Sequence, residues 1–382
     1  MAPTNLTELL SLARSHLASG DLEAAEATAR AAIDLYPNES SARTELGISL
    51  FRQGRFAESL AAHEEALALD AGNAESHGGR ALIWLLQGDL PRGLAEFEWR
   101  FQTGRVTRPP YTQPVWDGSP LTRRTILIHG EQGLGDTLQF VRYAAWVKQQ
   151  GGRVLLGCKS ALHGVLRGFP WADRMTAALS SADRFDCWVP MMSLPLLAGT
   201  TLETIPATIG YASADPGLVN AWRSELSKYA GLRVGIAWQG SPHRDREIPL
   251  QAFAPLAALP GVQLISLQKG AGTEQLAQLA DQFSVIDWSD RLDTTAGPLM
   301  DTAAIMQNLD LVITCDTSLA HLAGVLGVKV WIALPFVPDW RWLLDRRDSP
   351  WYPTARLFRQ RQRGDWKGVM AEMAGALAEF PR

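Results

Sequence analysis

Residues 311–321 read LVITCDTSLAH, in which four residues typical of a buried strand lead into a polar turn and then into a helix-start pattern. The same order of strand, turn and helix occurs at 125–138, TILIHGEQGLGDTL. Further strand-like runs alternate with helical stretches, so that the whole series is 125–129, 153–157, 186–190, 233–238, 262–267, 284–287, 309–314 and 329–334. Strands that alternate with helices imply parallel sheets covered on both faces. The break at 210–232 predicts two such sheets, with ligands beyond the carboxyl ends of their strands.

A different periodicity occupies the start of the chain. Gly20, Gly54 and Gly88 are separated by 34 residues each (54 − 20 and 88 − 54), which is the period of tetratricopeptide repeats. Small residues keep the same register before and after each glycine. This spacing predicts three helical hairpins over 1–105, of which the third is degenerate. Such hairpins either form a concave groove that binds a peptide or protein segment, or pack on the rest of the chain as a structural collar.

Composition excludes several classes of function. The 382 residues contain 36 Lys and Arg against 40 Asp and Glu, a formal net charge of −4, so no basic excess is available for a nucleic-acid backbone. No apolar run has the length of a bilayer span, and the first residues lack the pattern of a signal peptide, so we expect a cytoplasmic protein with no membrane span. Cys158, Cys187 and Cys315 are expected to be buried thiols. We predict no metal site and no cofactor, because no His, Cys and Asp cluster has metal-ligand spacing.

The first strand is followed by a glycine-rich loop, GEQGLGDT at 130–137. Glycines let a backbone approach a ligand and turn into a helix whose first N–H groups attract anions. An ATP-type phosphate loop would need lysine where Asp136 stands, and a dinucleotide fingerprint would need glycine or alanine where Leu138 stands, so both chemistries are disfavoured. Asp136 either accepts a proton from a bound hydroxyl or caps the helix expected at 138–149.

The loop after residues 311–314 has the composition of an anion site. A diphosphate could lie on the N–H groups of Thr317 and Ser318, with His321 one turn along on the same helix face. The alternatives are that His321 is a structural residue and that Asp316 is a helix cap.

Asp316-Thr317-Ser318 with His321 resembles the D-[ST]-G-x-x-H element of the heptosyltransferase-like (glycosyltransferase family 9-like) GT-B glycosyltransferases. The similarity covers most of 125–360, and the whole arrangement resembles bacterial tetratricopeptide-repeat glycosyltransferases, some of which modify flagellin. The resemblance implies that Thr317, Ser318 and His321 bind the donor diphosphate and that Asp316 orients the sugar or ribose. Ser318 stands where the family has glycine, which leaves the exact donor open.

In the first loop, Asp136 lies like the aspartate of the family, so the resemblance implies that it is the general base, on a loop shaped by Gly133 and Gly135. The resemblance also implies donor contacts after two strands of the second lobe, at Trp238, Gln239, Arg244, Arg246, Gln268 and Lys269. A guanidinium is a forked, permanently charged partner for phosphate, and a solvated charged loop is the alternative at the two arginines.

The predicted fold class is therefore α plus α/β: tetratricopeptide-like helical repeats over 1–105, then a GT-B domain of two Rossmann-like parallel-sheet lobes. We expect an N-terminal, acceptor-side lobe over 106–228, a C-terminal, nucleotide-sugar lobe over 229–360, and a terminal helix over 361–382 that returns to the first lobe. Trp340, in a tryptophan-rich segment, is expected to pack between the lobes or to present a face to a sugar.

The implied function is an inverting, metal-independent transfer of a sugar from a nucleotide-sugar donor to an acceptor hydroxyl, on a flagellin-like protein that the repeats recruit. Two alternatives stay open. One is a non-catalytic adaptor whose α/β domain senses a nucleotide or is a relic, and the other is a transferase that acts on a lipid-linked glycan.

Overall fold

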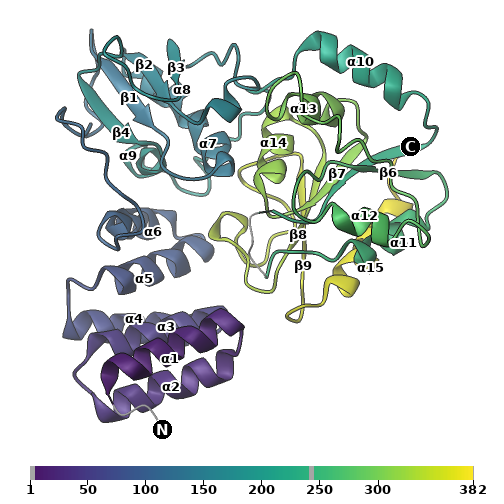
Figure 1. The fold of residues 1–382 in the computed structure, drawn as a ribbon. Helices are drawn as coiled ribbons and strands as arrows, with labels where there is room; N and C mark the ends of the chain where they lie inside the picture. The colour runs from purple at the N-terminus through teal and green to yellow at the C-terminus, as the bar shows by residue number, and fades with distance from the viewer. Residues whose placement is uncertain (1–4, 241–244, 382) are drawn as a thin grey trace. The chain divides into compact units, whose positions relative to one another are not determined.

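The computed structural model describes residues 5–240 and 245–381 (Figure 1). The described chain divides into two compact units. The helical unit contains the residues up to 110 together with 199–202 and 337–344, and the α/β unit contains 111–198, 203–336 and the residues from 345 onward. No described helix combines the length and the apolar character that a bilayer crossing requires.

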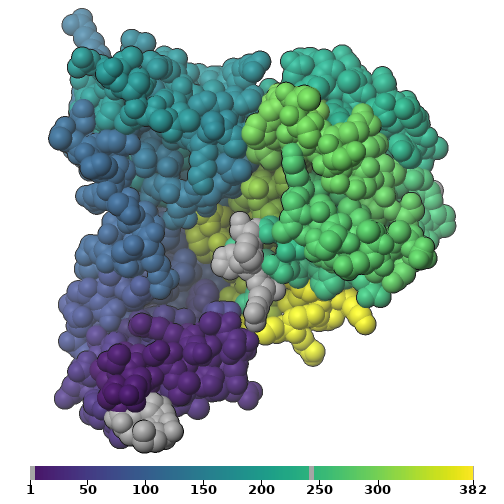
Figure 2. Space-filling view, viewed as in Figure 1, coloured from purple at the N-terminus to yellow at the C-terminus, as the bar shows by residue number. Residues whose placement is uncertain are grey.

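Three helical hairpins form the core of the helical unit, as the glycine spacing predicts. They are α1 (Leu6–Ser19) with α2 (Leu22–Leu35), α3 (Ser40–Arg52) with α4 (Phe56–Leu69), and α5 (Ala74–Leu86) with the shorter α6 (Leu90–Phe97), which leads into η1 (Glu98–Phe101). The first hairpin forms one continuous surface in the space-filling view (Figure 2). Gly20, Gly54 and Gly88 have φ of 86°, 82° and 86°, the left-handed conformation that ends a helix and that glycine adopts most easily.

Small residues let the helices of neighbouring repeats approach closely. The His63 ring of α4 fills the space beside Gly47 of α3, where a Cβ would lie 2.7 Å from the ring, and beside Gly79 of α5, where a Cβ would lie closer still. Burial, and to a smaller extent the charge of Arg80, lowers the pKa of His63 to about 4. His63 is therefore a neutral core residue whose size requires glycine on both neighbouring helices.

Two parallel sheets form the α/β unit, with strand orders β3-β2-β1-β4 and β6-β5-β7-β8-β9. The first sheet consists of β1 (Thr125–His129), β2 (Arg153–Gly157), β3 (Arg174–Thr176) and β4 (Cys187–Pro190). The second consists of β5 (Leu232–Ala237), β6 (Val262–Ser266), β7 (Leu311–Cys315), β8 (Val330–Leu334) and β9 (Ala355–Arg359). The predicted fold class, helical repeats followed by two Rossmann-like parallel-sheet lobes in a GT-B-like order, is confirmed.

The two sheets differ from the sequence prediction at their edges. β3 and β9 were not expected, because β3 has only three residues and β9 has arginine at two of its five positions. Residues 284–287 were expected to form a strand, but they contribute only an isolated bridge between Ile286 and Ile265. Edge strands are short and polar because one side of each is unpaired, so their apolar pattern is weak.

Helices lie on both sides of the second sheet (Figure 1). α13 (Met300–Met306) and α14 (Ser318–Leu326) lie together on one side, and α11 (Ala254–Ala257) and α15 (Trp366–Ala378) on the other. The other helices are α7 (Leu134–Phe140), α8 (Ala144–Gln149), α9 (Leu194–Leu197), α10 (Pro216–Leu226) and α12 (Glu274–Gln278), with short 3-10 turns η2 (Val141–Tyr143), η3 (Ser160–Leu162), η4 (Met191–Ser193), η5 (Leu250–Phe253) and η6 (Trp340–Trp342).

The terminal helix α15 belongs to the second lobe. Its apolar residues Val369, Met373 and Leu377 are part of one core with Trp331 of β8 and Phe358 of β9. We expected this helix to return to the first lobe. Instead, the apolar face that would make such a contact is already buried against the second sheet.

The tryptophan-rich segment is divided between the two units. In the helical unit, the Trp340 ring of η6 lies 6.5 Å from the Phe97 ring of α6, whereas Trp351, in the α/β unit, lies 5.6 Å from Phe140. Trp340 is only 5% exposed. The Trp340 ring is therefore too buried to present a face to a sugar, and the packing expected of it between the lobes stays a prediction.

The cysteines are buried thiols, as predicted. Cys158, Cys187 and Cys315 are all unpaired and buried, and burial raises the pKa of Cys158 to about 11 and that of Cys315 to about 12. Within residues 5–240 and 245–381, no three His, Cys, Asp or Glu side chains cluster as the ligands of a metal ion would.

Candidate active site

Two strand-turn-helix loops meet within the α/β unit. The first joins β1 to α7 and carries Gly135 and Asp136, and the second joins β7 to α14, the helix of His321. A Cβ built on Gly135 would lie 2.7 Å from His321 Cδ2 and 3.3 Å from its Nε2. The backbone of the first loop therefore touches the imidazole ring on α14, and glycine is needed because a side chain would have to displace that ring.

Asp136 lies inside helix α7 and not in front of it. α7 begins at Leu134, so Asp136 is its third residue, and Asp136 Oδ2 accepts a hydrogen bond from the Gly133 N–H at 2.8 Å. This side-chain bond stabilises the first turn, which explains why the helix begins earlier than residue 138. The half-buried carboxylate is thus a cap, and the same bond fixes its orientation.

Asp316 is buried at the carboxyl end of β7. Its side chain is 5% exposed, and Arg246 Nη1 lies 3.3 Å from Asp316 Oδ2 and 3.4 Å from the Asp316 carbonyl oxygen. The guanidinium is therefore held beside the loop that precedes α14. Of the two arginines assigned to the donor, only Arg246 can be placed, because Arg244 lies outside the described residues.

The start of α14 has the form of an anion site. Thr317 is the N-cap, its Oγ1 accepts a bond from the Leu319 N–H at 3.3 Å, and Ser318 is the first residue of the helix. Gly240 lies in the loop after β5, and a Cβ built on it would lie 2.8 Å from Thr317 Cγ2. The loop after β5 therefore also approaches the start of α14. The first N–H groups of a helix attract anions, and the charge of Arg246 lies close by.

The side chains of Trp238 and Gln268 hold the loop after β5 together. Trp238 is fully buried, and its indole N–H donates to the Gly272 carbonyl at 3.2 Å. Gln268 Oε1 accepts the backbone N–H groups of Trp238 and Gln239 at 3.1 Å each, and its Nε2 donates to the Gln239 and Ala271 carbonyls. The polar atoms of these two side chains therefore bind the protein's own backbone, and their contacts with a donor stay predictions.

Lys269 is used in a similar way. Its Nζ donates to the carbonyl oxygens of Leu292 and Asp293, at 2.6 Å and 3.3 Å. The ammonium therefore anchors the loop at 292–293, and its contact with a donor stays a prediction. Gln239 lies half-buried at the end of β5, with its backbone fixed by Gln268.

Tyr352 is a further residue of the site, and the sequence analysis missed it. Its hydroxyl lies 2.8 Å from His321 Nδ1, and the side chain is fully buried. The guanidinium of Arg142 lies 4.8 Å from the centroid of the Tyr352 ring and donates to the Trp351 carbonyl at 2.6 Å. The available sequence signal was an aromatic pair ahead of the last strand, which indicates packing and does not identify a histidine partner.

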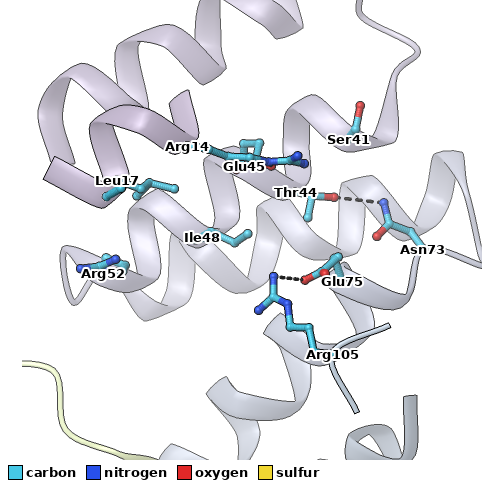
Figure 3. Close-up of a pocket in the computed structure, with 11 residues that line it drawn as sticks. Arg14, Leu17, Ser41, Thr44, Glu45, Ile48, Arg52, Asn73, Glu75 and Arg105 are labelled. Carbon is cyan, nitrogen blue, oxygen red and sulfur yellow. Dashed lines mark hydrogen bonds and ion pairs between the residues drawn. The ribbon is translucent and has the colours of Figure 1, made fainter. Parts of the chain in front are cut away.

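A second candidate site is the concave side of the helical unit, where a cavity of about 560 Å³ is lined by α1, α3, α5 and Arg105 (Figure 3). Arg14 Nε donates to Glu45 Oε1 at 2.5 Å, and Arg105 Nη2 donates to Glu75 Oε2 at 2.8 Å. Burial raises the pKa of Glu45, although the bond from Arg14 opposes this effect. Leu17, Ala18 and Ile48 add apolar surface to the lining. A concave repeat surface with charged, polar and apolar groups has the shape and chemistry for binding a peptide.

Fold and sites together define a helical-repeat protein with a two-lobed α/β body. Residues 10–74 and 44–98 match the tetratricopeptide repeat model, so the predicted repeats are tetratricopeptide repeats. Over 326 residues the chain is 28% identical to protein FlbA of Caulobacter vibrioides, and the match covers 79% of this chain and 54% of FlbA. The chain thus spans about half the length of this curated relative.

Among solved structures, the chain is similar to the glycosyl transferase family 9 protein from Veillonella parvula DSM 2008, with a TM-score of 0.48, 13% identity, and coverage of 67% of this chain and 96% of that chain. The type III secretion translocator chaperone SycD of Yersinia enterocolitica gives a TM-score of 0.24 and 23% identity, and covers 25% of this chain and 74% of that chain.

Proposed function

We propose that this protein is a glycosyltransferase that moves a sugar from a nucleotide-sugar donor to an acceptor hydroxyl. The observation that carries the proposal is the contact between the Gly135 backbone and the His321 ring. Through this contact, the carboxylate of Asp136 and the start of α14 belong to one site. A carboxylate beside an anion-binding helix start is what transfer from a nucleoside diphosphate sugar requires.

In the proposed step, the acceptor oxygen attacks the anomeric carbon of the donor sugar while its proton passes to the Asp136 carboxylate. The bond between that carbon and the diphosphate oxygen breaks, and the nucleoside diphosphate leaves with the electron pair. Attack and departure occur on opposite faces of the carbon, so its configuration inverts. The bond from the Gly133 N–H to Asp136 Oδ2 supports this role because it fixes the direction of the carboxylate.

The leaving diphosphate gains negative charge, and we assign its stabilisation to the start of α14. The backbone N–H groups of Thr317 and Ser318, the hydroxyl of Thr317 and the nearby guanidinium of Arg246 are all groups that favour an anion. Because these groups supply positive charge at the leaving oxygen, we propose that the transfer is independent of a metal ion.

The acceptor in this proposal is a protein that the repeats recruit. Support comes from the cavity on the concave side of the helical unit, whose lining includes Arg14, Arg105 and Glu45 (Figure 3). Charged groups on such a surface favour an extended, polar segment of a protein chain over an apolar lipid.

The proposal is tested in two measurements. The melting temperature is first recorded with UDP, ADP, GDP and CMP, since a ligand that binds the folded state raises it by mass action. The corresponding nucleotide sugars are then incubated with the chain and candidate acceptor proteins, and mass spectrometry detects the added sugar. If no nucleotide stabilises the chain and no nucleotide sugar is consumed, the proposal is wrong.

A non-catalytic adaptor is the second candidate, and specific observations favour it. The side chains of Trp238, Gln268 and Lys269 bind the protein's own backbone, and Asp136 already caps a helix. This candidate predicts that a nucleoside diphosphate binds while no nucleotide sugar is consumed with any acceptor, whereas the transferase predicts both binding and consumption.

A further inference from the structure

We propose that Tyr352 is a positioning residue that fixes the proton of His321 on Nε2, so that this N–H points to the donor diphosphate. The inference rests on the proposed function of the α14 start as a diphosphate site. It adds a residue that contacts neither donor nor acceptor and acts through His321.

The two edges of the His321 ring have different neighbours. Nδ1 lies 2.8 Å from the Tyr352 hydroxyl. The opposite edge, Cδ2 and Nε2, lies next to Gly135 of the first loop, since a Cβ on Gly135 would come within 2.7 Å and 3.3 Å of these atoms. Nε2 is therefore the ring nitrogen on the side where the two loops meet, and Nδ1 faces the protein interior.

The hydroxyl of Tyr352 can donate its proton to Nδ1, and a neutral imidazole that accepts at one nitrogen carries its own proton on the other. In that state Nε2 is a donor without the imidazole being charged. A diphosphate needs donors, so this tautomer suits the anion and the opposite tautomer would present a lone pair to it.

Tyr352 is held in place from two directions. Gly324, one turn after His321 on α14, has no side chain and lets the Tyr352 ring lie against the helix. On the other side, the buried Arg142 lies 4.8 Å from the centroid of the ring and binds the carbonyl oxygens of Trp351 and Pro206 at 2.6 Å and 2.8 Å. The hydroxyl therefore reaches Nδ1 from a fixed position.

Among residues 5–240 and 245–381, several titratable and charged groups lie around the ring or behind its partners. They are Tyr352 and, behind it, Arg142; Asp136 beside Gly135 on α7; and Asp316 with Arg246 at the start of the helix that carries His321. The substitution Tyr352→Phe removes the hydroxyl and keeps the ring and each of these charges.

The test uses inorganic pyrophosphate as the probe and isothermal titration calorimetry of the full chain. At pH 8 we expect Tyr352→Phe to weaken pyrophosphate binding by about tenfold or more, the usual effect of one hydrogen bond to a charged group. Once low pH has protonated the imidazole, both of its nitrogens carry a proton, so the ratio of the variant Kd to the wild-type Kd should fall towards one. Protonation of pyrophosphate changes the Kd of the variant and of the wild type by the same factor, so it does not change this ratio.

Two further variants separate positioning from simple packing. In His321→Gln, the amide can supply an N–H near the position of Nε2 without any tautomer, so adding Tyr352→Phe should cause no further loss of affinity. Tyr111→Phe is the matched control, because it also removes a tyrosine hydroxyl that lies beside a histidine Nδ1, that of His129 at 3.1 Å. It should lower the melting temperature and leave the Kd ratio at one at every pH.

A Tyr352→Phe defect that is the same at all pH values, or an additional loss in the His321→Gln background, overturns the role of Tyr352 while leaving the diphosphate site intact. Absence of binding by the wild-type chain to pyrophosphate and to UDP, ADP and GDP overturns the diphosphate site itself, and the inference with it.

Discussion

The two strand-turn-helix loops of the α/β unit each carry an aspartate, but the surroundings of the two carboxylates differ. Asp136 is half-buried in the first turn of α7, where one oxygen accepts the Gly133 N–H. Asp316 precedes α14, is 5% exposed and pairs with Arg246 at 3.3 Å. Both loops therefore connect a strand to a helix in the same way. In the first loop the start of the helix orients the carboxylate, and in the second loop the carboxylate forms an ion pair that anchors the loop.

This difference suggests a division of labour between the loops. A carboxylate that caps its own helix keeps a fixed direction and is not buried, so it can meet an acceptor hydroxyl. A carboxylate buried against a guanidinium instead holds positive charge at one place, which favours binding. We therefore expect substitutions in the first loop to act mainly on turnover and those in the second loop mainly on affinity for the diphosphate.

The largest effect is expected from Asp136→Asn. The amide keeps an oxygen for the Gly133 N–H but cannot take the acceptor proton, so kcat should fall by about a hundredfold or more while nucleoside diphosphate affinity stays nearly unchanged. Steady-state kinetics and calorimetry measure the two quantities. Asp215→Asn is the control, because Asp215 likewise caps a helix, α10, and should leave kcat unchanged. Equal turnover of Asp136→Asn and the wild type would assign only the capping role to Asp136.

Gly135→Ala should disturb both loops at once, although it changes a residue of the first loop only. The added Cβ would lie 2.7 Å from His321 Cδ2, so the ring must move, and we expect pyrophosphate affinity to fall about tenfold or more and the free energy of unfolding to fall by about 1–3 kcal/mol. Gly375→Ala on α15, where no atom lies within 4 Å of the new Cβ, should instead add up to about 1 kcal/mol. Calorimetry and urea unfolding check both, and wild-type affinity in Gly135→Ala would show that the loops do not form one site.

Arg246→Gln should weaken the second loop as a binding surface. Loss of the guanidinium beside Asp316 is expected to raise the Kd for pyrophosphate about tenfold and to reduce its dependence on salt concentration. Arg233→Gln is a matched control, since Arg233 pairs with Asp310 at the same distance, 3.3 Å, at the opposite end of β5. If the two variants bind pyrophosphate equally well, Arg246 has no specific role at the diphosphate.

The smallest effect is expected from Thr317→Ala. The N-cap hydroxyl accepts a rather long bond, 3.3 Å from the Leu319 N–H, so the cost in stability should be about 0.5–1 kcal/mol, with an additional rise of a few fold in the Kd for pyrophosphate. Asp365→Ala removes the N-cap of α15 in the same lobe and should cost stability alone. Thermal melting and calorimetry distinguish these outcomes; a pure stability loss in Thr317→Ala would mean that its hydroxyl does not reach the anion.

The helical repeats and most of the strands could be predicted from the sequence because their signals are local. A glycine every 34 residues ends the first helix of each hairpin, and buried parallel strands are continuous apolar runs. The edge strands β3 and β9 could not be predicted, since an unpaired side tolerates polar residues such as those of Arg174–Thr176. The start of α7 was misplaced because a side-chain bond from Asp136 offsets the helix-breaking effect of the glycines.

The candidate site was predicted only in part, and the missing part is long-range. The positions of Asp136, Thr317 and His321 follow from strand ends and helix starts. The partner of His321 is Tyr352, 31 residues away, and no periodicity relates the two. Likewise, the sequence did not predict that the side chains of Gln268 and Lys269 bind backbone carbonyls. Sequence shows that such a residue follows a strand and does not show which way its side chain points.

The helical unit is assembled from three separate stretches of chain: the residues up to 110, 199–202 and 337–344. Leu202 lies where a Cβ on Gly88 would meet it at 2.9 Å, and Trp340 lies against Phe97. The repeats alone therefore do not form a complete folding unit. A fragment cut at residue 110 would expose apolar side chains of its last hairpin to water. A chimaera that exchanges the repeats between relatives would have to exchange residues 199–202 and 337–344 as well.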